Sequence, residues 1–74
     1  MAQAAEQYDA RRELLKILLA RVQRDRHPSV TMMNLVEQLI GPDERPIYAE
    51  VLMDKIRQDS HPSLDMMQRV LALA

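Results

Sequence analysis

Two short motifs in this chain of 74 residues combine side chains that could do chemistry. Asp25 stands two residues before His27, and Asp59 stands two residues before His61. Imidazole and carboxylate groups can bind a divalent metal such as Zn²⁺, and a carboxylate can orient a histidine for acid–base catalysis. Each histidine also precedes a proline, where a role in starting a helix is the simpler interpretation. We therefore expect no metal, no cofactor and no catalytic residue.

The two motifs belong to one repeated segment. Residues 25–36 align with residues 59–70 at an offset of 34, and seven of the twelve aligned positions are identical. Proline disfavours helical geometry in the residue before it but suits the first turn of a new helix. Each copy therefore predicts a unit of helix, tight turn and helix. The offset equals the length of a tetratricopeptide repeat, but the Trp, Gly, Tyr and Phe of that family are missing from their set positions, so we assign no family.

Hydrophobic periodicity predicts an all-α fold. Apolar residues recur every three or four positions, and no segment alternates with the period of two that is typical of strands. The predicted helices cover residues 4–24, 28–40, 46–58 and 62–74. Successive helices joined by short turns pack as antiparallel pairs. We predict four short helices arranged as two αα-hairpins in a single domain, 1–74, with repeat units of about 8–40 and 46–74.

Proline, serine and glycine mark the predicted helix ends. Pro28 is expected at the first position of the second helix, with His27 in its N-cap region. Ser29 and Ser63 are expected to satisfy N–H groups of the first turn. Gly41, the only glycine of the chain, is expected to end the second helix in the left-handed conformation.

Composition limits how the chain is stabilised and what it binds. It has no Cys, which excludes disulfides and thiolate metal sites. It also has no Phe or Trp. A chain this short is marginally stable alone, and an oligomer is the simplest source of further buried area. The net charge of −1 gives no general attraction to nucleic acid. No apolar run approaches the roughly 18 residues of a membrane span, and no secretory signal is recognisable at the N-terminus. We expect a cytoplasmic protein.

Paired methionines occur at equivalent positions of the repeat. Neighbouring helical residues point about 100° apart, so one methionine of each pair should enter the core and the other should reach a surface. Met32 and Met66 lie near the centres of their apolar arcs and are expected in the core. Flexible thioethers suit contacts with proteins. The apolar arc of the first predicted helix is also wider than one packing neighbour requires, which favours a second contact. The residues predicted to bind a partner are Met33, Met67, Leu14, Ile17 and Met53.

These observations favour a small, non-enzymatic interaction module. We expect a homodimeric helical bundle that binds another protein as an adaptor or regulatory subunit. The alternative is a dimeric DNA-binding regulator that uses the first and second helices. The second helix would present Thr31, Asn34 and Gln38 to base edges, and the first would supply a modest basic footprint, although acidic residues are interleaved with its basic ones. Glu37 and Asp65 lie on the polar faces of the second and fourth helices, and phosphate binding requires a basic footprint. Nucleic acid is therefore the less favoured partner.

Overall fold

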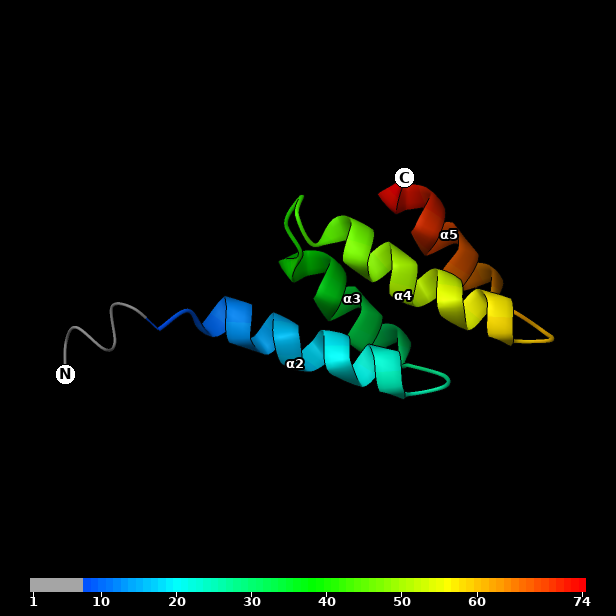
Figure 1. Ribbon diagram of the computed structural model, residues 1–74, viewed down its shortest axis with the longest axis horizontal. Coiled ribbons are helices and arrows are strands. Elements are labelled where there is room, and N and C mark those ends of the chain that lie inside the picture. The colour runs from blue at the N-terminus through cyan, green and yellow to red at the C-terminus, as the bar shows by residue number, and fades with distance from the viewer. Residues whose placement is uncertain (1–7) are drawn as a thin grey trace.

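Four α-helices make up most of residues 8–74, the part of the chain that the computed structural model describes (Figure 1). They are α2 (Ala10–Arg24), α3 (Val30–Leu39), α4 (Arg45–Gln58) and α5 (Leu64–Leu73). No strand occurs within residues 8–74. The all-α prediction is confirmed for these residues. None of the four helices combines the length and apolar character needed to cross a membrane.

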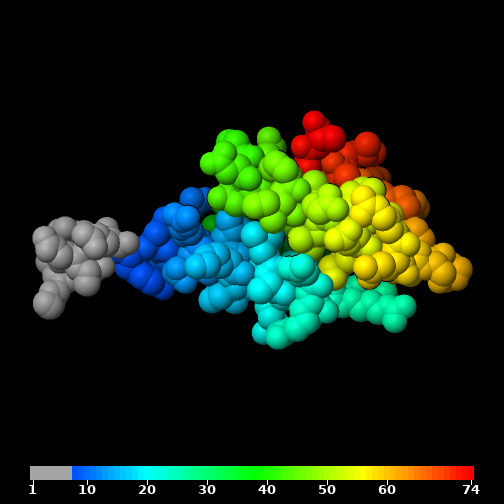
Figure 2. Space-filling model, viewed as in Figure 1, coloured from blue at the N-terminus to red at the C-terminus, as the bar shows by residue number. Residues whose placement is uncertain are grey.

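The helices pack mainly on their neighbours in the chain. α2 packs on α3, α4 packs on α5, and α2 also packs on α4 (Figure 1). We refer to α2 with α3 as the first helix pair and to α4 with α5 as the second. In Figure 2 α2 lies at one edge of the molecule and α5 at the opposite edge. The contact between the pairs therefore runs through the middle of the fold.

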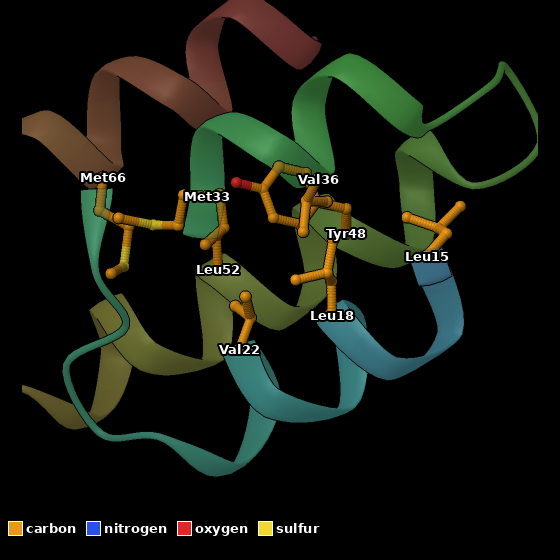
Figure 3. Close-up of a cluster of buried hydrophobic side chains, with 8 residues drawn as sticks. All are labelled: Leu15, Leu18, Val22, Met33, Val36, Tyr48, Leu52 and Met66. Carbon is orange, nitrogen blue, oxygen red and sulfur yellow. The ribbon is translucent and has the colours of Figure 1, made fainter. Parts of the chain in front are cut away.

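One apolar core joins all four helices. Its buried residues are Leu15, Leu18, Val22, Met33, Val36, Tyr48, Leu52 and Met66. Figure 3 shows their side chains as a continuous row from Met66 to Leu15. On α2 the buried residues are three and four positions apart, which places them on one side of the helix. The largest side chains without any exposed surface, Tyr48 and Leu52, both come from α4.

Serine side chains begin α3 and α5. Each Oγ accepts a hydrogen bond from the N–H three residues later, at 3.0 Å for Ser29 and 3.1 Å for Ser63. The capping role expected of both serines is confirmed. The prediction of His27 as the N-cap and Pro28 as the first helical residue is wrong. Both precede the cap, because the serine hydroxyl satisfies the first-turn N–H and α3 begins only at Val30.

The start of α2 also differs from the prediction. The predicted helix began at residue 4, whereas α2 begins at Ala10; residues 4–7 lie outside the described residues. Asp9 is the N-cap, and its carboxylate accepts a hydrogen bond from the Arg12 N–H at 3.1 Å. An acidic side chain at this position satisfies an orphan donor and complements the helix dipole.

The expected left-handed glycine is absent. Gly41 has no positive φ, because α3 ends with Ile40 in an extended conformation and the chain leaves the helix directly. The Gly41 N–H donates to Oε1 of Glu44 at 2.6 Å. A Cβ at residue 41 would lie 3.2 Å from the same oxygen. The role of Gly41 is therefore to let the Glu44 carboxylate approach the backbone closely, and not to provide a left-handed conformation.

Removing a serine cap should cost more than changing the histidine in the same turn. Ser29→Ala and Ser63→Ala should each lower the free energy of unfolding by about 1 kcal/mol. His27→Asn and His61→Asn should change it by less than about 0.5 kcal/mol, since both histidines are exposed. Urea denaturation of the four variants provides the comparison. Equal losses for serine and histidine variants would contradict the assignment of the caps.

Candidate functional site

The two His-Pro-Ser turns hold their helices in place and do not assemble a reactive group. His27 and His61 are both exposed. Within residues 8–74 no three His, Asp or Glu side chains lie close enough together to hold a metal ion. Asp59 Oδ1 accepts a hydrogen bond from the His61 N–H at 3.1 Å, which is the geometry of an Asx turn. The Asp59 carboxylate therefore has a local role in the turn.

Lys55 joins α4 to the end of α2. Its ammonium group donates to the carbonyl oxygens of Gln23, at 2.9 Å, and Asp25, at 2.6 Å. Carbonyls at a helix C-terminus lack intrahelical partners and carry partial negative charge. Burial lowers the pKa of Lys55, and the charge of Asp25 opposes that change. Lys55 and Asp59 are four positions apart, but no ion pair joins them within residues 8–74, because the ammonium group binds the neighbouring helix instead.

A half-buried polar cluster connects α3, α4 and α5. Glu37 Oε2 accepts hydrogen bonds from the Tyr48 hydroxyl and from Arg69 Nη1, both at 2.7 Å. Arg69 also donates to Asp65 at 2.8 Å and to Asn34 at 3.0 Å. Its side chain is only 10% exposed. The planar guanidinium group, with its fixed set of donors, can bind several acceptors at once. Arg69 therefore connects the second helix pair to the first.

The electrostatics of this cluster fix its charges near neutral pH. Burial raises the pKa of Tyr48, and its hydrogen bond to Glu37 raises it further. Burial by itself lowers the pKa of Arg69, but hydrogen bonds to Glu37 and Asp65 outweigh that effect and raise it. A neutral phenol and a permanent cation do not exchange protons near neutral pH. The arrangement suits a structural joint between helices better than an acid–base site.

Alkaline pH should weaken the fold through Tyr48. Folding raises the pKa of this phenol above its ordinary value of about 10. Its stabilisation is therefore complete below about pH 10 and is lost as the pH rises towards the folded-state pKa. Tyr8→Phe leaves Tyr48 as the only tyrosine, so tyrosinate absorbance then reports on it alone. That absorbance should appear together with loss of helical circular dichroism; ionisation near pH 10 in a fully helical chain would contradict the burial of the hydroxyl.

The polar cluster was not predicted from the sequence. The apolar period puts Glu37 on the polar face of its helix and predicts no role for Arg69. The repeat does contain a sign of this cluster, because at two of its positions a charged residue in one copy aligns with an apolar residue in the other. Leu35 aligns with Arg69, and Glu37 aligns with Leu71. Such pairs indicate positions at which the two halves of the chain meet different surroundings.

The five residues predicted to bind a partner fall in different environments. Leu14 and Ile17 are exposed on α2, whereas Met53 and Met67 are half-buried. Met33 is only 3% exposed, so its assignment to a partner surface is wrong. It belongs to the same buried cluster as Leu52 and Met66 of the second helix pair (Figure 3). Leu52 and Met66 cover the edge of α3 at Met33. The apolar pattern of α3 by itself does not predict that this edge is covered.

The division of each methionine pair between core and surface differs between the two halves. On α5 Met66 is buried and Met67 is half-buried, which is the predicted order. On α3 the order is reversed, because Met33 is buried and Met32 is half-buried. The first helix pair is covered by the second at this edge. The corresponding edge of α5 has no third pair to cover it within residues 8–74.

The residues of the DNA-binding alternative do not form a free, base-reading surface. Asn34 accepts a hydrogen bond from Arg69 through Oδ1, so its side chain already serves the polar cluster. Glu37 carries its negative charge beside it, with its side chain about a third exposed. Thr31 and Gln38 are exposed, but no basic residue of α3 accompanies them. The geometry gives this alternative no support.

Large apolar side chains remain exposed on both helix pairs. On α2, Leu14 is 45% and Ile17 58% exposed, and residues three positions apart are neighbours on a helix surface. Leu35 on α3 is 41% exposed, and Leu71 on α5 is 75% exposed. A single exposed leucine is ordinary, whereas a contiguous apolar patch marks a surface that contacts another molecule.

Comparison with protein-family models, with curated proteins and with solved structures finds no match to this chain. The geometry of the chain itself is therefore the guide to its function. Its two informative features are the exposed apolar side chains of α2, α3 and α5 and the polar cluster between the helix pairs.

Proposed function

We propose that this protein is a small, non-enzymatic interaction module that associates with its own chain. The observation that carries this proposal is the exposed pair Leu14 and Ile17 on α2, on the side of the helix that does not enter the core. Removing apolar surface from water contributes about 25 cal/mol per Å². A small domain with only eight buried apolar residues among residues 8–74 gains much from such a contact.

In this proposal the two helix pairs are two copies of one packing unit, each an αα-hairpin. The N-caps Ser29 and Ser63 are 34 residues apart. The last residues of α3 and α5 have the same separation, and so do those of α2 and α4. A unit that packs against a copy of itself within one chain has surfaces that suit further copies.

The proposed role is that of an adaptor or regulatory subunit without a cofactor. Groups that could do chemistry are engaged in holding the fold: Asp59 in its turn, and Glu37 with Arg69 between the helix pairs. A module of this kind works by presenting a surface, and its activity is binding. The exposed apolar residues are the part of the chain that fits such a role.

Sedimentation equilibrium tests this function. The wild-type chain should show an average mass that rises with concentration above the 8.6 kDa of one chain. Leu14→Glu should weaken association by at least about tenfold, because a carboxylate would be buried in an apolar contact. Ile47→Glu is the matched control, since Ile47 is 57% exposed and the residue aligned with it is Glu13. It should leave the mass unchanged.

Two results would count against the proposed function. A wild-type chain that stays monomeric at every concentration would remove self-association. Equal effects of Leu14→Glu and Ile47→Glu would show that association does not use the surface around Leu14.

A further inference from the structure

The contact between the helix pairs has a polar centre whose three residues are all aligned with leucines. Glu37 of the first pair is held by Tyr48 and Arg69 of the second, each at 2.7 Å. The residues aligned with them at the offset of 34 are Leu71, Leu14 and Leu35, respectively. One acid, one phenol and one guanidinium group thus change together into three apolar side chains.

These leucines lie on the free sides of the two units. Aligned residues occupy the same side of their own helix pair. Glu37 lies on the side of the first helix pair that contacts the second helix pair, so Leu71 lies on the side of the second helix pair that points away from the first. Tyr48 and Arg69 lie on the side of the second helix pair that contacts the first, so Leu14 and Leu35 lie on the side of the first helix pair that points away from the second. All three leucines are between 41% and 75% exposed. α2 and α5 also lie at opposite edges of the molecule (Figure 2).

The remaining residues of the contact show the same asymmetry. Met33 and Val36 of α3 are buried beneath the second helix pair. The aligned residues on α5, Met67 and Val70, are half-buried. Each side of the internal contact therefore has an uncovered counterpart at the other end of the molecule. We call the two counterparts the leading face (Leu14, Ile17 and Leu35) and the trailing face (Met67, Val70 and Leu71).

We propose that a second copy of this chain binds head to tail, with its leading face on the trailing face of the first. This inference rests on the proposed function and specifies its partner and geometry. The new contact repeats the internal one, with Leu71 packed against Leu14 and Leu35 in place of the polar cluster. The change from polar to apolar occurs on both sides of the contact, as complementarity between copies requires. Such a heterologous contact continues into an open stack or closes into a ring.

A charged side chain at the edge of the contact fits the same arrangement. Lys55 donates to two carbonyl oxygens at the C-terminus of α2. Its aligned residue, Arg21, is exposed on α2. In the head-to-tail contact Arg21 meets the C-terminus of α4 of the next copy, where the carbonyls of Arg57 and Asp59 are the aligned acceptors. Arg21 thus donates to a helix C-terminus in the contact between copies, as Lys55 does within the chain.

Two complementary variants test this geometry. The trailing variant carries Leu71→Glu, and the leading variant carries Leu14→Tyr and Leu35→Arg. Each variant by itself should associate at least about tenfold more weakly than the wild type, because a charged group would face leucine. An equimolar mixture should recover assembly, because the two unaltered faces pair as in the wild type and the two altered faces reproduce the Glu–Tyr–Arg cluster of the internal contact. Sedimentation equilibrium measures all three samples, with Ile47→Glu as the control that should behave as wild type.

The possible failures are distinguishable. A wild-type chain that never exceeds one copy would overturn both the proposed function and this inference. If the wild type associates and either variant alone still pairs as tightly, the contact uses one face twice, and only the head-to-tail geometry is wrong. Two weakened variants that do not recover on mixing would also overturn it. Circular dichroism confirms folding, and Leu71→Gln replaces a trailing variant that has lost helix content.

Discussion

Met33→Glu should leave the chain largely unfolded at neutral pH. Met33 is 3% exposed and belongs to the central core, where a carboxylate would have no partner. Burying such a group costs roughly 2 to 7 kcal/mol even before its charge is considered. A small domain has about 5 to 15 kcal/mol of total stability, and a chain of this length is at the low end of that range. Far-ultraviolet circular dichroism should show the loss of helix.

Met67→Glu is the matched control for this substitution. It introduces the same charge at the aligned position of the second helix pair, where the side chain is half-buried. A flexible glutamate can reach water there, so the helix content should persist, although association through the trailing face should weaken. If Met33→Glu also stays folded, or if both variants unfold alike, the asymmetry between the two helix pairs is wrong.

Arg69→Leu should lower the free energy of unfolding by about 1 to 3 kcal/mol. The substitution removes a donor from Glu37, Asp65 and Asn34 together, and a half-buried carboxylate is left without its cation. The cost stays below that of a deeply buried pair because the Glu37 side chain is about a third exposed. Urea denaturation gives the value. Arg57→Leu is the control, since the ion pairs of Arg57 are exposed and should contribute less than about 0.5 kcal/mol.

A triple variant separates the polar pairing from the packing at the same place. Glu37→Leu, Tyr48→Leu and Arg69→Leu together reproduce the residues of the two free faces. Replacing the three residues at the centre of the cluster by apolar groups leaves no buried charge without a partner, because Asp65 and Asn34, which lose Arg69, are exposed. The triple variant should therefore be more stable than Arg69→Leu alone. A greater loss in the triple variant, or equal losses for Arg69→Leu and Arg57→Leu, would contradict the role given to the cluster.

The sequence was sufficient for features that depend on local spacing. Four helices followed from the apolar period, and the buried residues of α2 lie where that period placed them. Ser29 and Ser63 were identified as capping residues because a hydroxyl at a helix start has one nearby set of donors to satisfy. The start of α2 was missed because an acidic residue, Asp9, is as effective an N-cap as serine.

Features that depend on how the helix pairs meet were not predictable from the spacing of one helix. The centre of the apolar arc on α3 lies at Met32, but the second helix pair covers its edge at Met33. Arg69 and Glu37 look like solvent-facing residues until the two pairs are brought together. The exposed residues Leu14 and Ile17 were predicted as binding residues because the apolar arc of their helix is wider than one neighbour can cover. Their use by a partner stays a prediction.

Methyl NMR spectra recorded over a dilution series test directly whether this chain binds itself through its leading and trailing faces. We expect concentration-dependent shifts at the methyl groups of Leu14 and Leu35 together with those of Leu71, while those of Ile47 stay unchanged. Simultaneous shifts on both faces indicate that the leading face of one copy contacts the trailing face of the next. Spectra that are identical from the highest to the lowest concentration, or shifts confined to Ile47, would contradict the proposal that this chain binds itself through its two apolar faces.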